Sequence, residues 1–485
     1  MAQENINYNR KWIILLAIGM GVFLSTIDGG IVNIGLNTLV KEFDKPLIVI
    51  EWVVLAYMLT VSSLMLSIGR LGDMIGKKNL YVAGMVIFTI GSVLCGLSPT
   101  IYWLITFRVL QAIGASILMA LGTAMVTEAF PDNERGKALG ILGTLVSIGI
   151  IAGPTIGGLL LESLSWHWLF FVNLPVGVIG VILVIRYVPA SRPGARQKFD
   201  FPGALTLFIG LSALLFALSS IQTNGFNSPS VFVLLGVFVV ALVVFILIET
   251  HVHEPMIDLS IFKNRLFTVN LVTGFMTFIV SAGTTIILPL YLQNVLNFGP
   301  RQSGLMLAIT PLIVALIAPL AGTLSDRIGS RVITSLGLTM LLIGQIAVSS
   351  LGAETTVIGY LLRFIPVGIG IGLFQAPNNS AVMGSVPREH SGVASSLLSL
   401  TRTVGQTTGI AVLGAFWERR VSALAGGKAF ENITLAPINA QVGGLRDTIY
   451  LVIVIIFVAL CLSLWALSVW RRERRKTALQ PGSTD

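Results

Sequence analysis

The stretch GRLGDMIGKK, from Gly69 to Lys78, decides the fold of this chain, because it occurs a second time in a related form. The second copy, GTLSDRIGSR, runs from Gly322 to Arg331 and keeps Gly, Asp and Gly at the same spacing, with cations after the last glycine. Glycines permit a tight turn and a close approach of helices, and the aspartate can pair with a cation or face the positive end of a helix. Two copies in register favour an internal repeat over the alternative of an ordinary basic loop.

Six residues of the two copies are candidates for conformational gating loops. They are Gly69, Asp73, Gly76, Lys77, Asp326 and Arg327.

Long apolar stretches flank both copies and recur along the whole chain. Of the 485 residues, 54% are hydrophobic and 11% are charged, whereas soluble domains have a charged share of roughly 25%. Stretches of roughly 20 apolar residues can cross a hydrocarbon core about 30 Å thick. The sequence predicts an all-α integral membrane protein with fourteen transmembrane helices, at about 13–35, 50–68, 80–98, 101–126, 138–160, 168–187, 203–221, 231–249, 268–291, 303–323, 332–350, 357–380, 393–416 and 448–470.

The basic residues predict the orientation of these spans, since Lys and Arg are retained on the cytoplasmic side. Most of the 31 basic residues fall on one side if the amino terminus is inside, including the run RRERRK at 471–476. An even number of spans then places both termini in the cytoplasm. We therefore expect a multi-pass protein of the cell (plasma) membrane, in which the net charge of +9 needs no nucleic acid to explain it.

The distance between the two copies predicts the domain organisation. They lie eight spans apart, which is what two six-helix halves would give if two extra helices were inserted between them. Repeated halves with a binding site at their interface are a usual build of secondary transporters. The predicted units are an N-terminal six-helix bundle at 1–198, two inserted transmembrane helices at 199–260, and a C-terminal six-helix bundle with a basic cytoplasmic tail at 261–485.

Further motifs, taken in their order along the chain, point to a known family. They are DGGIVN at 28–33, WVVLAY at 52–57, RVLQAIG at 108–114, GIIAGPTIGG at 149–158, WHWLFFVNLP at 166–175, YLQ at 291–293, GVASS at 392–396 and RTVG at 402–405. Together with the repeated loop, they make the chain resemble the fourteen-span drug:proton antiporters of the major facilitator superfamily over nearly its whole length. The chain departs from that family at Gly30, where Thr is usual, and at His167, where Arg is usual.

The resemblance implies the major facilitator fold and a proton-coupled multidrug efflux antiporter, which exports hydrophobic or cationic drugs and toxic compounds by alternating access and gives antibiotic resistance. The alternatives are an exporter of a lipid, a glycolipid or a dedicated metabolite, and a membrane scaffold or sensor without transport. The expected partners are a small hydrophobic or amphipathic substrate, protons and the lipid bilayer, with no nucleic acid. We expect a monomer without cofactor or metal, and no enzyme, because no soluble catalytic domain and no Gly-rich phosphate loop are visible in the sequence.

Asp28 is the main candidate for proton coupling. A carboxylate within a span is costly and normally faces the bundle interior or a water-filled cavity. Arg108 lies at a comparable depth in its own span, and Gln111, one turn on, shares its face. We expect Arg108 to meet Asp28 and to modulate its protonation. A static hydrogen-bonded Asp28 and an Arg108 that only pins helix ends are the alternatives.

Several other residues are candidates for contact with the substrate or for coupling. Arg402 lies near mid-membrane and Arg363 about two turns into its span, and each needs an acceptor or water. Either could face an anionic group, and static bonding between helices is an equal alternative. The remaining candidates are Asn33, Tyr57, Tyr291 and Gln293.

A stripe of small residues lies in the span at 138–160 and consists of Gly149, Gly153, Pro154, Gly157 and Gly158. Small residues and a proline kink permit a close helix crossing. The run resembles the antiporter motif of the family, which implies export over import. Tight packing alone is the alternative, and both can hold.

Overall fold

The computed structural model describes residues 10–45, 47–50, 52–189, 199–224, 228–252, 255, 257–387, 390–426 and 436–478. These residues form helices and connecting loops, with no strand among them. The first helices are α1 (Lys11–Phe43), α2 (Leu47–Ile50), α3 (Trp52–Ile75), α4 (Lys77–Gly96), α5 (Ile101–Ala129), α6 (Arg135–Ser163), α7 (Trp168–Phe171) and α8 (Asn173–Tyr187). The later ones are α9 (Phe201–Asn224), α10 (Pro229–His251), α11 (Arg265–Leu290), α12 (Pro300–Ile328), α13 (Ser330–Val348), α14 (Val357–Met383), α15 (Ser391–Leu424) and α16 (Ile438–Ala478).

Polar residues and prolines set where several of these helices begin. The Thr100 hydroxyl caps α5 and the Thr356 hydroxyl caps α14, each by accepting a hydrogen bond from a backbone N–H three residues on. Pro229 and Pro300 stand in the first turns of α10 and α12, where the missing N–H costs no hydrogen bond. Between such starts the apolar runs become helices, because lipid offers no partner for an unsatisfied backbone group.

Twelve helices within the described residues are long and apolar enough to cross a membrane. The prediction of an all-helical, multi-pass membrane protein is thereby confirmed. Two further long helices, α6 and α15, are not among these twelve, although each packs along several of the others.

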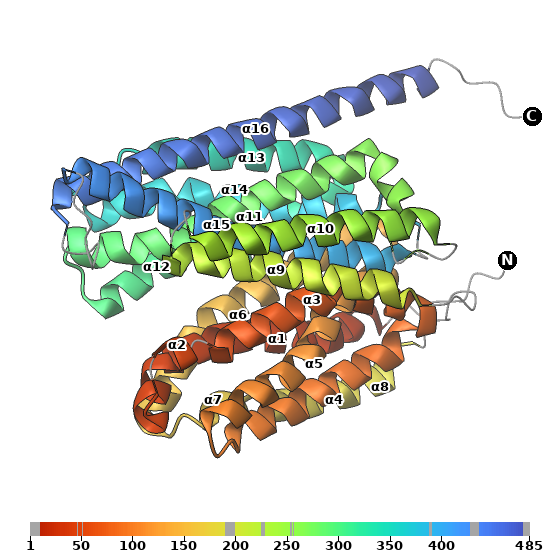
Figure 1. Ribbon diagram of the computed structural model, residues 1–485. Coiled ribbons are helices and arrows are strands. Elements are labelled where there is room, and N and C mark those ends of the chain that lie inside the picture. The colour runs from red at the N-terminus through yellow and green to blue at the C-terminus, as the bar shows by residue number, and fades with distance from the viewer. Residues whose placement is uncertain are drawn as a thin grey trace, which may run out of the picture.

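The helices form two groups with a pair between them (Figure 1). In the first group α1 packs on α5, α6 and α8, and α4 packs on α5. In the second, α14 packs on α12 and α13, and α15 on α11 and α16. The groups meet where α6 contacts α12 and α3 contacts α15. The pair α9 and α10 lies beside that junction, with α9 against α3 and α15.

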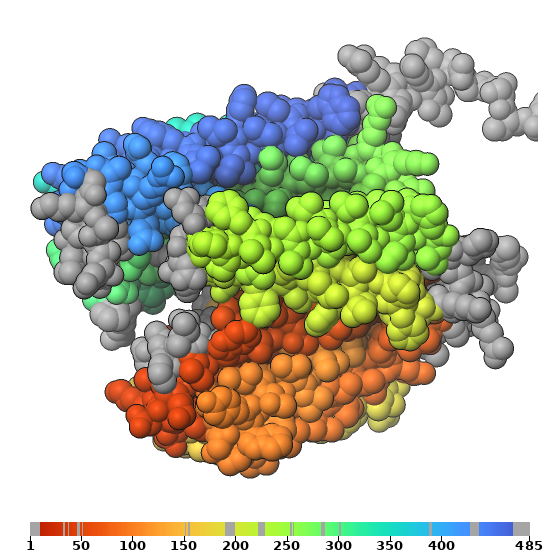
Figure 2. Space-filling model, viewed as in Figure 1, coloured from red at the N-terminus to blue at the C-terminus, as the bar shows by residue number. Residues whose placement is uncertain are grey.

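The two groups touch mainly at one end of the molecule. We call it the motif end, because it carries the loops 69–78 and 322–331, together with the start of α1 and the end of α16 (Figure 1). Toward the opposite end, near α2 and α12, the groups diverge, and a notch separates them in the space-filling view (Figure 2).

Both repeated loops have the same backbone geometry at their last glycine. Gly76 has φ +97° and Gly329 has φ +96°, and each directly precedes the next helix of its half. With ψ of 134° and 137° both lie outside the left-handed helical region, and such sparsely populated backbone states cost a residue with a Cβ about 1–3 kcal/mol, so glycine is favoured at both turns.

Candidate transport site

Asp28 lies at the centre of a buried hydrogen-bond network. Its Oδ2 accepts from Arg108 Nη1 at 2.5 Å, and its Oδ1 accepts from Gln111 Nε2 at 2.8 Å and from Asn173 Nδ2 at 3.1 Å. The carboxylate and the guanidinium are both 0% exposed. Asp28, Arg108 and Gln111 were predicted from the sequence as one group, and the structure brings them together.

Arg108 ties a third helix into the network. Its Nε donates to the carbonyl oxygen of Val53 in α3 at 2.9 Å, and its Nη1 also donates to Gln111 Oε1 at 2.8 Å. The guanidinium carbon lies 4.1 Å from the ring centroid of Tyr57, a cation–π contact. Its Nη2 is buried and has no hydrogen-bond partner. A change of charge at Asp28 would therefore be felt in α1, α3, α5 and α8 at once.

Asn173 belongs to this network, although the sequence did not single it out as a site residue. It is 1% exposed at the start of α8, and its Nδ2 also donates to Ser92 Oγ in α4 at 3.0 Å. The signal in the sequence is its place in the motif WHWLFFVNLP at 166–175, two residues before Pro175. Tyr57 also packs here, and its hydroxyl donates to the Ser25 carbonyl at 3.3 Å.

The first repeated loop closes the motif end across the two groups. Asp73 accepts from the backbone N–H groups of Gly392 and Val393, at 2.9 and 3.1 Å, at the start of α15. A carboxylate at this position interacts favourably with the helix dipole. A Cβ on Gly69 would stand 2.6 Å from the carbonyl oxygen of Gly392, so glycine permits the approach.

Lys77 adds a charge clamp to the first loop. Its Nζ lies 2.8 Å from Asp73 Oδ1 and 2.9 Å from Glu128 Oε1. Ser391 in turn donates to Glu128 at 2.6 Å. The lysine is 6% exposed, so the clamp is shielded from solvent.

The second loop makes the corresponding contact on α6. Asp326 accepts from the backbone N–H groups of Gly136 and Lys137, at 2.9 and 3.0 Å, and a Cβ on Gly322 would collide with the Gly136 backbone. Arg327 is exposed.

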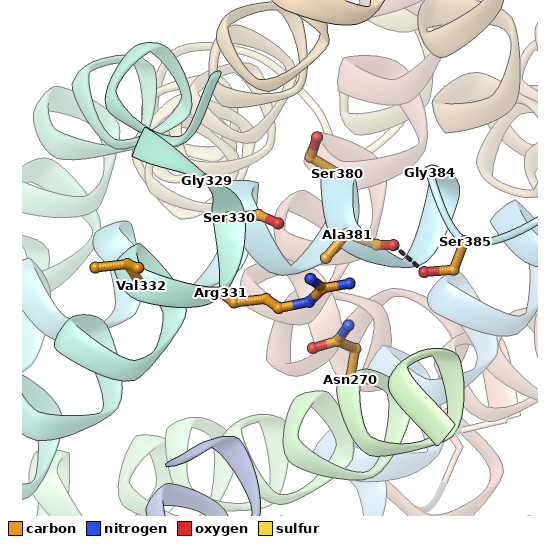
Figure 3. A pocket seen from close by; sticks show the side chains of 9 residues that line it. All are labelled: Asn270, Gly329, Ser330, Arg331, Val332, Ser380, Ala381, Gly384 and Ser385. Carbon is orange, nitrogen blue, oxygen red and sulfur yellow. Dashed lines mark hydrogen bonds between the residues drawn. The ribbon is translucent and has the colours of Figure 1, made fainter. Parts of the chain in front are cut away.

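At the position equivalent to Lys77 the second loop carries Ser330. Figure 3 shows it beside Arg331, whose side chain points into a pocket of about 220 Å³ between α13, the end of α14 and Asn270.

The small-residue stripe of α6 packs against α1. A Cβ on Gly153 would stand 3.0 Å from the Ile27 carbonyl oxygen, and one on Gly157 would stand 3.1 Å from that of Ile31. Gly149 faces Thr26, whereas a Cβ on Gly158 would have nothing within 4 Å. Pro154 is part of α6, but its side chain lies outside the described residues. The stripe thus brings α6 close to the helix that carries Asp28.

Four of the remaining sequence candidates, Tyr291, Gln293, Arg363 and Arg402, have no described contact with the Asp28 network. Tyr291 donates to the Gly352 carbonyl at 2.7 Å, and Gln293 is exposed. Arg363 donates to Ser350 Oγ and to the Gly359 carbonyl, at 2.9 and 2.8 Å, which fits static bonding near a helix end. Arg402 is half-buried in α15. Asn33 lies in α1, but its side chain is outside the described residues.

Comparison with known proteins now decides the family, because the sequence profile of the Major Facilitator Superfamily matches residues 18–410. The chain belongs to the Major Facilitator Superfamily. Members of this superfamily are transporters rather than enzymes, which accords with the absence of a catalytic domain from the sequence.

Relatives within the superfamily differ in the cargo that their names state. The riboflavin transporter RibZ of Clostridioides difficile is 38% identical over 417 residues, which is 85% of this chain and 90% of the relative. The multidrug resistance protein Stp of Mycobacterium tuberculosis is 33% identical over 402 residues, 83% of this chain and 75% of the relative. The solved structure of the proton:xylose symporter XylE superposes with a TM-score of 0.62 at 14% identity, over 93% of this chain and 96% of that one, and so supports the fold alone.

Proposed function

We propose that this protein is a proton-coupled antiporter of the cell membrane that exports hydrophobic or amphipathic small molecules by alternating access. The observation that carries the proposal is the pairing of Asp28 with Arg108, both 0% exposed, inside the first group of spans. Ionisable residues at membrane depth are costly and mark ion pathways and proton relays. A multidrug resistance protein among the relatives supports a drug-like cargo.

The fold that we propose for this function has fourteen spans in the units 1–198, 199–260 and 261–485. It counts α6 and α15 as membrane-crossing helices. They hold 29 and 34 residues, which at 1.5 Å per residue exceeds a hydrocarbon core of about 30 Å. The basic loops and the basic end of α16 then lie in the cytoplasm, with both termini.

In that orientation the present conformation is outward-facing. The contacts of Asp73 with α15 and of Asp326 with α6 hold the two halves together at the cytoplasmic end. Opening inward requires both contacts to break, because each joins one half of the protein to the other. The repeated loops therefore act as gates.

Protonation of Asp28 is the event that we connect to this gating. The added proton removes the negative charge that compensates Arg108, and a lone buried charge is strongly destabilising. Arg108 must then reorganise its bonds to Val53 and Gln111, which lie in α3 and α5. Because α3 ends in the first gate loop, the charge of Asp28 can bias the gate.

Dye accumulation in inside-out vesicles tests the proposal. Intact protein should accumulate a hydrophobic dye against its gradient when the vesicle lumen is made more acidic than the outside. A protonophore should abolish this accumulation. The Asp28→Asn variant, at equal expression, should only equilibrate the dye. Accumulation that survives either treatment would exclude proton coupling through Asp28.

A second candidate cargo is a lipid or a dedicated metabolite. A nearly apolar cavity of about 410 Å³ lies between α9 and α10 and the helices α3, α11 and α15, and is lined by Leu66, Phe245, Phe275 and Leu397 among others. A riboflavin transporter among the relatives also favours a dedicated cargo. Extraction and mass spectrometry of compounds bound to purified protein would separate this candidate from drug export.

A further inference from the structure

Arg402 is a charged residue of the membrane interior without a counter-charge. Among the residues that the structure describes, none forms a hydrogen bond or ion pair with its guanidinium. Arg108, by contrast, is bonded to Asp28, Gln111 and Val53. Because an unpaired charge within a membrane protein is costly, we expect the guanidinium of Arg402 to have an anionic partner that the described residues do not supply.

Arg402 lies on α15 one turn beyond the hydrogen bonds that join this helix to α5, and it is half-buried. Ser395 Oγ accepts from the Ala124 N–H at 3.3 Å, and Ser399 Oγ donates to the Met119 carbonyl at 3.0 Å, both across the gap to α5. Arg402 follows Ser399 by three residues and so lies on the same helix face, one turn farther from the motif end.

Helix α11 packs on the adjoining part of the same face, because Gly405 follows Arg402 by three residues just as Arg402 follows Ser399. Gly405 lies against α11, where its Cβ would stand 3.0 Å from the Phe275 carbonyl oxygen. Leu397 and Val404 line the apolar cavity beside α9 and α10. Arg402 therefore lies between the contact of α15 with α5 and its contact with α11, one turn beyond the described hydrogen bonds to α5.

Within the described part of the second half, no carboxylate is placed to neutralise Arg402, and Asp326 of α12 is bonded to α6. The helices α11, α13 and α14 contain no Asp or Glu, and Asp447 of α16 is paired with Arg420. Glu418 is the sole acidic residue of α15, about 24 Å farther along the helix at 1.5 Å per residue. Across the gap, Asp28 is fully enclosed by its own partners.

We propose that Arg402 binds an anionic oxygen group, such as a carboxylate, on the transported compound, so that the cargo is an amphipathic organic acid. A guanidinium presents two parallel N–H donors that match a carboxylate. The cargo would supply the counter-charge that the second half lacks, whereas a cationic compound would be repelled. This inference rests on the proposed transport function and narrows its cargo from the hydrophobic or cationic compounds implied by resemblance.

Binding of matched acids and esters to the purified full-length protein tests the assignment without any proton gradient. The probes are a rhodamine with a free carboxylate and its methyl ester, together with a panel of aromatic carboxylic acids and their methyl esters. Fluorescence polarisation measures the rhodamine pair, and thermal stabilisation in detergent measures the panel. Each acid and its ester share the same body, cationic in the rhodamine pair and uncharged in the aromatic panel, so the difference in affinity within each pair reports the carboxylate charge.

The intact protein should bind acids about tenfold or more tightly than esters, the factor that a charge-assisted hydrogen bond gives. Arg402→Ala should bind both forms equally, and Arg402→Lys should keep part of the preference. Arg446→Ala, which removes an exposed arginine of α16, should behave like the intact protein. If Arg402→Ala does not purify as a single species, Arg402→Gln takes its place.

Two results would overturn the assignment: no acid in the panel binds more tightly than its ester, or the preference persists without Arg402. Gradient-driven transport of the same dyes is measured separately. Acid preference without gradient-driven transport would refute the proposed proton coupling and leave the Arg402 site intact. Gradient-driven transport without acid preference would refute the Arg402 site and leave the proposed proton coupling intact.

Discussion

In the half of the molecule that runs from α1 to α8, the buried carboxylate Asp28 and the buried Arg108 neutralise each other, whereas in the half from α11 to α16 Arg402 has no partner among the described residues. The two halves share a loop motif and a turn geometry at Gly76 and Gly329. The repeated scaffold therefore does not dictate the charges that it carries. We interpret this difference as a separation of proposed roles, with proton coupling in the first half and cargo binding in the second.

The two repeated loops also differ, and again the first half has the additional charge pairing. Asp73 binds the start of α15 and is also clamped by Lys77, which reaches Glu128. Asp326 binds the start of α6, but Ser330 stands where the lysine would be. The first gate should therefore be the stronger of the two.

The largest effect is expected from unpairing the buried ions of the first half. Asp28→Asn leaves Arg108 without its counter-charge and should destabilise the protein by about 3–5 kcal/mol, seen as a lower melting temperature in detergent. The double variant Asp28→Asn with Arg108→Gln removes both charges and should recover most of this loss. Equal melting of the single and double variants would mean that the pair is not a coupled unit.

Removing the gate carboxylates should shift the conformational equilibrium unequally. Each loses hydrogen bonds to a charged group, worth about 1.5–3 kcal/mol, but Asp73→Asn also removes one of the two carboxylates that pair with Lys77. Distances between spin labels across the motif end should show a larger inward-open population for Asp73→Asn than for Asp326→Asn. A larger shift for Asp326→Asn would reverse the ranking of the gates.

The small-residue stripe should tolerate a methyl group at one position and not at another. Gly153→Ala places a Cβ 3.0 Å from the Ile27 carbonyl oxygen and should cost about 1–3 kcal/mol through overpacking against α1. Gly158→Ala meets open space and is the matched control. Identical melting curves for the two variants would show that α6 does not pack on α1 in this way.

The smallest difference between the two halves is expected at the two turns, where the backbone is alike. Gly76→Ala and Gly329→Ala each force a Cβ into a positive-φ conformation that residues other than glycine rarely adopt and should cost about 1–3 kcal/mol, by the same amount within error. A free-energy cost several times greater at one turn would show that the two turns differ in backbone strain despite their similar φ values.

The sequence predicted the parts of this molecule that depend on composition and repetition. Apolar runs and basic loops were enough to predict the helical membrane fold, and the repeated Gly-Asp-Gly spacing singled out Asp73 and Asp326, which the structure places in contact with the other group of helices. The meeting of Asp28 with Arg108 followed from depth within the spans, since a charge at that depth needs a partner.

Other features could not be read from the chain, because they depend on which helix faces lie together. The role of Asn173 arises from the packing of α8 on α1 and α4, and the contact of Asp73 with Gly392 joins residues far apart in sequence. The sequence also did not distinguish Arg363 from Arg402. Arg363 donates to acceptors near its own helix end, whereas Arg402 has no partner among the described residues.

The central claim is that cargo and protons move in opposite directions through the charge of Asp28. The direct measurement is the internal pH of proteoliposomes, reported by a trapped pH dye, when a transported dye is made to flow down its gradient without an imposed proton gradient. Intact protein should move protons against the dye flow, and Asp28→Asn should carry dye without a pH change. A pH change of equal size with Asp28→Asn, or none with the intact protein while dye moves, would contradict the account.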